Sequence, residues 1–291
     1  MKILVPTDFS ELSEKALDVA NRFAKLMDGT ITPFHSHIPI SEMDEPYALG
    51  MSSQMYQDFD QIEDALSDRL SQLAEEKVDK KRLEKPIIMM GNPAQSIIDV
   101  SEEYDYIVMS THGRTGFTRF LLGSVAEKVL RLAHTPVLIV EDESDVDDFK
   151  KILVTTDFSE NAASAYPYAK IVAEKAGADL DLVHVISFDQ LDDEEEGSIS
   201  LSNLREKRIK VLEKEHFHSL KGKVNSTVIV SQDSPHEAIF NHVKENNYNL
   251  IVMATVGRTG INYLMMGSTT ANLVRHVNTA VLSVNPKRDK Q

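Results

Sequence analysis

The chain opens on KILVPTDFSE at residues 2–11 and repeats this stretch almost unchanged as KILVTTDFSE at residues 151–160. Nine of the ten positions agree, at an offset of 149 residues. A second pair of segments, YDYIVMSTHGRTG at 104–116 and YNLIVMATVGRTG at 248–260, matches at an offset of 144. Because the matching blocks keep their order, the sequence predicts two copies of one domain, with a few loop residues lost from the second copy.

An acidic stretch separates the two copies. Six of the nine residues from Glu141 to Phe149 are Asp or Glu. Such a run is typical of a solvated linker whose charges repel one another. We therefore expect a first domain over residues 1–141, an acidic linker over 142–149 and a second domain over 150–291.

Short apolar runs alternate with segments of helical period in each copy. The helical segments expected in the first copy are 10–27, 60–78, a helix opened by Asn92 and Pro93, and 124–133, while 38–58 is expected to be irregular. The expected strands are 3–5, 30–37, 86–90, 105–109 and 137–140, then 152–154, 180–185, 227–230, 250–253 and 281–284. This order predicts the α/β class, with a parallel sheet in each copy and helices on both of its faces.

The bulk composition limits the partners and the compartment. The net charge is −15, which disfavours binding to the phosphate backbone of nucleic acids or to anionic membranes. The chain has no cysteine, so disulfides and thiolate metal sites are excluded. No run approaches the roughly 20 apolar residues of a membrane helix. We expect a cytoplasmic protein without nucleic-acid or membrane partners.

Candidate ligand-binding residues lie where two strands end. In open α/β sheets ligands bind beyond the carboxyl ends of the strands, at the switch in strand order. Here these ends carry Thr7 and Asp8 after the first strand, and residues 110–124 after the fourth. Gly113 allows a close approach of backbone to a ligand, and Gly123 with Ser124 opens a helix whose N–H groups suit phosphate.

Other interpretations of the same residues stay open at this point. Ser124 and Glu127 have the spacing of a capping box, so Ser124 could serve only as a helix cap. Asp8 could form an Asx turn or cap the helix that follows it. Arg114 and Arg258, at matched loop positions, either contact phosphate or are ordinary exposed arginines.

These segments resemble the universal stress protein family. Nucleotide-binding members carry Gly, two residues, Gly, nine residues, Gly, and then Ser or Thr. The chain has Ser110-x2-Gly113-x9-Gly123-Ser124, and its second copy has Ala254-x2-Gly257-x9-Gly267-Ser268, so a small residue replaces the first glycine in each. The resemblance covers both halves almost from end to end and includes the start, Val5 to Ser10.

The resemblance implies two tandem, doubly wound domains of the adenine nucleotide alpha hydrolase-like type. Each would have a five-stranded parallel sheet in the order 3-2-1-4-5 and would bind ATP, with or without Mg²⁺, between strands 1 and 4. The aspartate after strand 1 contacts the adenine end in such proteins, and the end of strand 2 lines the base pocket. The implied nucleotide-binding residues are Pro6, Thr7, Asp8, Ser36, Ser110, His112, Gly113, Arg114, Gly123 and Ser124, and in the second copy Thr155, Thr156, Asp157, Val185, Ala254, Gly257, Arg258, Gly267 and Ser268.

Two functions follow as hypotheses. The first is a stress-response regulatory protein that binds ATP in one or both domains, with slow hydrolysis at most, because we identify no general base or nucleophile. The second is a scaffold that keeps the fold without the nucleotide.

The halves are expected to contact each other through their last strands as an intramolecular pseudo-dimer, and a further homodimer is compatible with the sequence. A zinc site at His35 and His37 is a minor alternative to ordinary strand-end histidines.

Overall fold

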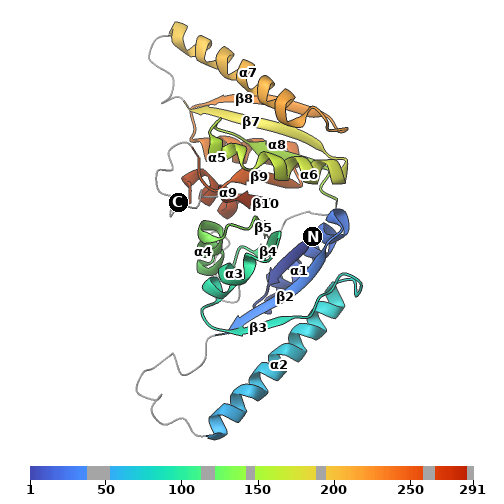
Figure 1. Ribbon diagram of the computed structural model, residues 1–291. Coiled ribbons are helices and arrows are strands. Elements are labelled where there is room, and N and C mark those ends of the chain that lie inside the picture. The colour runs from blue at the N-terminus through green and yellow to red at the C-terminus, as the bar shows by residue number, and fades with distance from the viewer. Residues whose placement is uncertain (38–52, 113–121, 142–147, 188–194, 258–265, 287–291) are drawn as a thin grey trace, which may run out of the picture.

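The computed structural model describes residues 1–37, 53–112, 122–141, 148–187, 195–257 and 266–286. Ten strands form one sheet in the order β3-β2-β1-β4-β5-β10-β9-β6-β7-β8 (Figure 1). Each half of the sheet has the order 3-2-1-4-5 and parallel pairing, as expected. The strands are β1 (Lys2–Pro6), β2 (Thr30–His37), β3 (Ile87–Met90), β4 (Tyr106–Ser110), β5 (Val137–Val140), β6 (Lys151–Thr155), β7 (Asp179–Ser187), β8 (Val224–Ser231), β9 (Leu250–Ala254) and β10 (Ala280–Val284).

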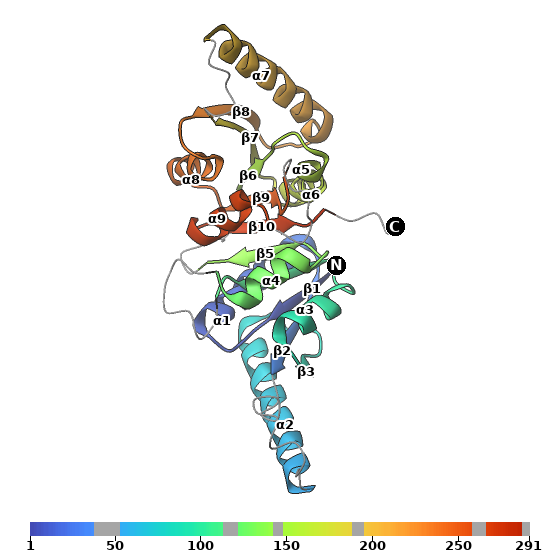
Figure 2. The ribbon, with the colours of Figure 1, turned by 90° about the vertical axis from the view of Figure 1, so that its left-hand side faces the viewer.

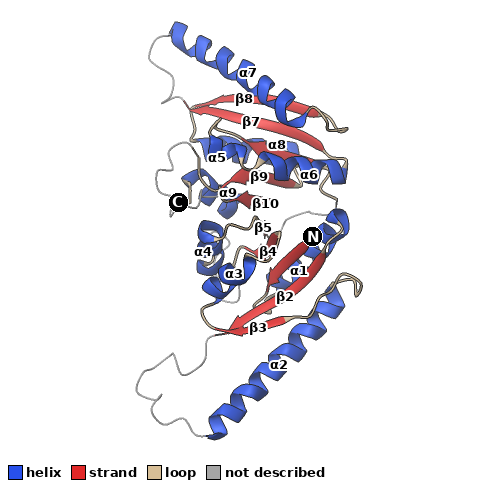
Figure 3. Cartoon of the chain, viewed as in Figure 1, coloured by secondary structure: helices blue, strands red, loops and turns tan. Residues whose placement is uncertain are grey.

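Helices connect the parallel strands and cover both faces of the sheet (Figure 3). The long helices α2 and α7 lie at its two outer ends, and α2 extends well beyond β3 (Figure 2). The helices are α1 (Glu11–Met27), α2 (Ser53–Lys77), α3 (Pro93–Ser101), α4 (Ser124–Leu132), α5 (Glu160–Ala163), α6 (Tyr166–Ala176), α7 (Glu195–Phe217), α8 (Pro235–Asn246) and α9 (Ser268–His276).

The central strands β1, β4, β5, β6, β9 and β10 are mostly apolar because both faces of the sheet are buried there. Successive side chains of a strand point to opposite faces. Ile3 and Val5 therefore belong to one core cluster, and Leu4 between them belongs to the other. Each cluster continues from the first domain into the second, so the two domains share a core on each face of the sheet.

The two halves of the sheet join at β5 and β10, which pair antiparallel, with Leu138 opposite Leu282. Asn285, one residue after β10, donates from its side-chain amide to the carbonyl oxygens of Arg131 and Ala133 at 3.2 and 3.1 Å. These carbonyls lie at the C-terminal end of α4, where a helix has no backbone N–H groups of its own to bond to its last carbonyl oxygens. The second domain thus completes the hydrogen bonding of a helix in the first.

Aromatic side chains close the other face of this joint. The ring of Tyr106 meets that of Tyr168 edge-on, with centroids 6.0 Å apart. The ring of Phe149 lies 5.6 Å from that of Phe23 and is buried. The expected solvated linker is therefore wrong for its last residue, because Phe149 contributes to the core; residues 142–147 lie outside the described chain.

One further expectation about the helices is wrong, and the two domains differ in one helix. The segment 38–58 was expected to be irregular, yet α2 begins at Ser53; residues 38–52 lie outside the description. The helix after the first strand is continuous in the first domain, whereas in the second it is divided into α5 and α6. Pro167 at the start of α6 accounts for the break, because proline lacks the N–H that a continuous helix would need there.

In the part of the chain that the structure describes, every helix is too short or too polar to cross a lipid bilayer.

A buried hydroxyl on β10 makes a prediction about stability. Ser283 is buried beside the β5–β10 joint, and its Oγ has no hydrogen-bond partner among the described residues. We expect Ser283→Ala to raise the free energy of unfolding by about 1 kcal/mol, because the cost of desolvating the hydroxyl disappears. Urea unfolding followed by circular dichroism measures it.

Ser101→Ala is the matched control. Ser101 is equally buried, but its hydroxyl donates to the carbonyl oxygen of Ile98 at 2.8 Å. This substitution should lower the free energy of unfolding by about 1 kcal/mol. Equal losses for both variants would contradict our interpretation of Ser283.

Candidate functional site

The first strand of each domain ends in the same tight turn. The backbone N–H of Thr7, just after Pro6, continues the ladder by donating to the carbonyl of Phe34 at 2.8 Å. Asp8 Oδ1 then accepts from both the N–H and the hydroxyl of Ser10, at 3.1 and 2.6 Å. Asp8 therefore forms the Asx turn that the sequence left open.

The second copy builds this turn with the same bonds. Thr156 follows Thr155, the last residue of β6, and its N–H donates to the carbonyl of Val183 at 2.9 Å. Asp157 Oδ1 accepts from the N–H and hydroxyl of Ser159 at 2.9 and 2.5 Å. Both aspartates are thus held at the carboxyl end of the sheet by their own helix-capping serine.

A phenylalanine in the left-handed region completes each turn. Phe9 has φ 62° and Phe158 has φ 64°, values that a residue with a large side chain rarely adopts. The threonine two residues earlier stabilises each one, since Thr7 Oγ1 and Thr156 Oγ1 accept the phenylalanine N–H at 3.0 Å. The repetition of this unusual conformation shows that the turn is specified by both copies of the sequence.

Each of the two phenylalanine rings contacts a histidine and an arginine. In the first domain His35 is 4.7 Å from the ring of Phe9, and the guanidinium of Arg69 on α2 is 4.3 Å from the same ring. In the second, His184 and Arg208 on α7 lie 4.3 and 4.8 Å from Phe158 in the same way. Each stack ties a long outer helix to the strand end that carries the aspartate.

The fourth strand of each domain ends against the start of the next helix. Ser110 and Ala254 are the last residues of β4 and β9. The residues after them, Thr111 and Thr255, accept the N–H of Gly123 and Gly267, each at 2.8 Å. A Cβ on either glycine would lie 3.1 Å from that threonine carbonyl oxygen. A side chain at either glycine would therefore push strand and helix slightly apart.

Gly123 and Gly267 are the N-caps of α4 and α9. Ser124 and Ser268 are the first residues inside these helices, and their side chains are exposed. The capping-box interpretation of Ser124 is wrong, because that motif needs the serine at the N-cap position, which glycine occupies. Among the described residues no side chain caps either helix, and the positive end of each helix dipole attracts anions at this position.

The residue at the end of the second strand differs between the domains. Ser36 is buried, its hydroxyl donates to the carbonyl of Gly91 at 3.0 Å, and its Oγ lies 3.3 Å from Ser96 Oγ. Ser36 therefore links β2 to the turn between β3 and α3. Val185, its counterpart, is buried without such a bond and offers only an apolar surface.

Two side chains of the second domain lie against Gly257, at the start of the loop that follows β9. A Cβ on Gly257 would lie 2.6 Å from Asp157 Oδ2, so the two residues that the repeat motif singles out are in contact. Asn161 on α5 donates from its side-chain amide to the carbonyl of Gly257 at 3.2 Å. Val256 beside it is buried. The first domain has Leu12 at the position of Asn161, and Leu12 cannot form this bond.

The remaining candidate residues are placed as follows. His112, the counterpart of Val256, is half-buried, and its Nδ1 lies 3.0 Å from Thr111 Oγ1. Gly113, Arg114 and Arg258 lie outside the described residues. His35 and His37 stack with their rings 6.4 Å apart, which confirms that they share a strand face. Within the described ranges no group of three or more histidine, aspartate or glutamate side chains is arranged to hold a metal ion.

The sequence reasoning missed Phe9, His35, Arg69 and Asn161 as parts of this region. The repeat carried a signal for the first two, since Phe9 matches Phe158 and His35 matches His184 at the same offset of 149 residues. Arg69 and Arg208 fall outside the well-matched blocks, and the first copy has Leu12 where the second has Asn161. Only the packing of α2, α5 and α7 reveals them.

The uncapped helix start makes a prediction. We expect Ser124→Ala and Ser268→Ala to change the free energy of unfolding by less than about 0.5 kcal/mol, because both hydroxyls are exposed and neither caps its helix. Asn92→Ala is the control. Asn92 Oδ1 accepts the N–H of Gln95 at the N-cap of α3, so its loss should cost about 1 kcal/mol. A comparable loss for Ser124→Ala would restore the capping interpretation.

Comparison with known proteins agrees with this geometry. The Universal stress protein family matches residues 1–141 and again residues 148–285. A universal stress protein of Methanocaldococcus jannaschii, MJ0577, is 34% identical over 152 residues, which cover 48% of this chain and 94% of that protein. One from Mycolicibacterium smegmatis is 26% identical over 302 residues and covers 98% and 97% of the two chains.

A solved structure has the same two-domain extent. The crystal structure of a universal stress protein from Archaeoglobus fulgidus is 26% identical, with a TM-score of 0.70 over 98% of both chains. The family match in each half, the matching strand order and the paired strand-end turns lead to one conclusion: the chain belongs to the universal stress protein family and contains two of its domains in tandem.

Proposed function

We propose that this protein is a stress-response regulator that binds ATP, with or without Mg²⁺, in the crevice of its first domain. The observation that carries the proposal is the start of α4, where Gly123 brings an uncapped helix end within 2.8 Å of the backbone of Thr111. Asp8 ends the neighbouring strand and is the residue we assign to the adenine end. Phosphate oxygens would be held by the N–H groups of α4 and by Ser124.

The overall acidity of the protein does not oppose this assignment. Although the net charge is −15, exposed charges are screened beyond about 8 Å in physiological salt. Backbone N–H groups in direct contact with phosphate act at hydrogen-bond distance, together with the partial positive charge of the helix end. The local donors therefore dominate over the distant carboxylates.

The second domain is proposed to bind nucleotide weakly or not at all. Asn161 and Asp157 both contact Gly257, so a ligand would first have to displace them. This observation also favours the second candidate function, a scaffold that keeps the fold without a nucleotide, for this half of the chain. The first domain would then bind the ligand, and the second would act as a scaffold.

We further propose the domain limits 1–141 and 150–291, with residues 142–149 between them, and a cytoplasmic location. The β5–β10 ladder supports treating the two domains as an intramolecular pseudo-dimer. Analytical ultracentrifugation with and without nucleotide would test whether two whole chains also form a homodimer.

The proposal predicts one nucleotide per chain. Small molecules released by heating the purified protein should include an adenine nucleotide, and calorimetric titration with ATP, ADP and cyclic AMP should identify the preferred ligand and its stoichiometry. Gly123→Val should abolish binding, because its Cβ would meet the Thr111 carbonyl oxygen at 3.1 Å and disturb the helix start. Gly267→Val has the same geometry in the second domain and should leave the stoichiometry unchanged.

A second substitution tests why the domains differ. Asn161→Ala removes the side chain that bonds to Gly257 and should raise the stoichiometry above one. If no adenine nucleotide travels with the protein and ATP gives no heat, the scaffold function applies to both domains. If Gly267→Val rather than Gly123→Val abolishes binding, the assignment to the first domain is wrong.

A further inference from the structure

The outermost strand of the second domain has an unusual edge. β8 runs for eight residues and, within the described residues, pairs only with β7. Its sequence, VNSTVIVS, contains no charge, proline or glycine and is rich in β-branched residues. Natural sheets normally protect such edges with short strands, charges or proline. The opposite edge follows that rule, since β3 has only four residues.

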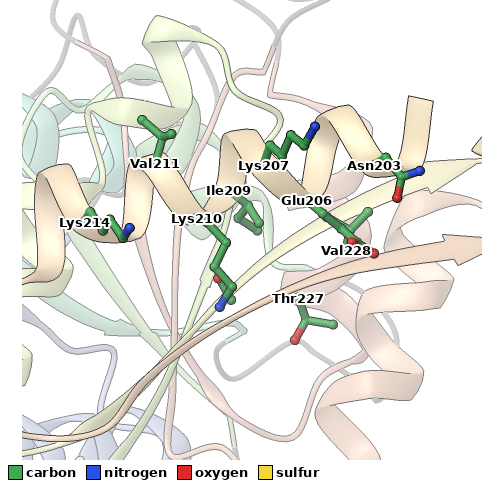
Figure 4. Close-up of a pocket in the computed structure, with 10 residues that line it drawn as sticks. Asn203, Glu206, Lys207, Ile209, Lys210, Val211, Lys214, Thr227 and Val228 are labelled. Atoms are coloured by element: carbon green, nitrogen blue, oxygen red, sulfur yellow. The ribbon is translucent and has the colours of Figure 1, made fainter. Parts of the chain in front are cut away.

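A groove of about 670 Å³ lies between α7 and β8 (Figure 4). The strand contributes three consecutive residues to its lining: Ser226, Thr227 and Val228. Consecutive side chains of a strand point to opposite faces of the sheet. The groove therefore lies beside the middle of β8, a strand whose outer backbone N–H and C=O groups have no neighbouring strand among the described residues.

The helix side of the groove carries positive charge. Lys207, Lys210 and Lys214 line it at helical spacing, and all three are exposed. Figure 4 shows the side chain of Lys210 directed from α7 towards β8. The Nζ of Lys210 lies 3.0 Å from Glu213 Oε2, which also accepts the hydroxyl of Ser226 on β8 at 2.5 Å, while the lysine side chain itself is 56% exposed. Glu206 is the acidic residue in the lining.

Apolar side chains are exposed beside these lysines. Val211 on α7 lines the groove and is 50% exposed. Leu204, about two turns earlier on the same helix, is 60% exposed. Val230 on β8 is 47% exposed. An occupant of the groove would therefore bury apolar surface as well as neutralise the lysines.

We propose that β8 binds an extended acidic peptide segment of a partner protein, which joins the sheet edge as an additional strand. Main-chain hydrogen bonds to β8 supply the general affinity of such strand addition. Because an extended peptide presents every second side chain to α7, acidic residues at alternate positions would meet Lys207, Lys210 and Lys214, with β-branched residues between them. The inference does not rest on nucleotide binding.

The test uses a fluorescein-labelled peptide of alternating valine and glutamate, matched in length to β8. We expect saturable binding by fluorescence anisotropy and slower amide hydrogen exchange across residues 224–231. Replacing Lys207, Lys210 and Lys214 together by Glu should weaken binding by about tenfold or more. A valine–lysine peptide of the same length should not bind.

The matched control replaces Lys80, Lys81 and Lys85 by Glu. These lysines are exposed before β3, and the change alters the net charge equally. It should leave the affinity unchanged. Thr227→Asp, a single change on the exposed side of β8, should weaken binding even if the triple variant folds poorly.

Three results would overturn the proposal. The first is no binding of the valine–glutamate peptide, and the second is equal loss in the control triple variant or protection of amides outside β8. The third is displacement of the peptide by a single-stranded DNA oligonucleotide or by vesicles containing phosphatidylserine, if the protein binds either of them more tightly than the peptide. That result would mean that the lysines form a general surface for polyanions.

Discussion

The antiparallel pairing of β5 with β10 is the interaction on which the rest of the molecule depends. It turns two five-stranded sheets into one, so the apolar clusters on the two faces run through both domains without interruption. It also removes two strand edges that would otherwise present unpaired backbone groups to water. The remaining free edges, β3 and β8, lie at opposite ends of the sheet, and each is accompanied by a long helix.

Side chains also form contacts across the β5–β10 joint. Asn285 satisfies the end of α4, and Glu127 on α4 lies 3.8 Å from Arg275 on α9. The polar contacts sit on one face of the sheet, while the aromatic contact between Tyr106 and Tyr168 lies on the other. Burial raises the pKa of both tyrosines further above neutrality, so these hydroxyls stay uncharged within the joint.

The two domains contain the same turn after their first strand, but the residues around that turn differ. The Thr-Asp-Phe-Ser turn has the same hydrogen bonds and the same left-handed phenylalanine in both domains. Around it, Pro167 divides the helix that remains whole in the first domain, and Asn161 on the shortened α5 reaches the loop at Gly257. A local change in helix continuity thus accompanies a contact that Leu12, at the matching position of the first domain, cannot make.

The sequence by itself determined the duplication, the α/β class, the strand order through the family resemblance, and the identity of the turn residues. These follow from local pattern, because apolar period and turn chemistry depend on neighbours in the chain. Only the tertiary structure decided that glycine rather than Ser124 caps α4, that Phe149 is buried, that Ser36 bonds to the β3–α3 turn, and that Asn161 meets Gly257. Each of these depends on contacts between segments distant in sequence, whose geometry no local pattern encodes.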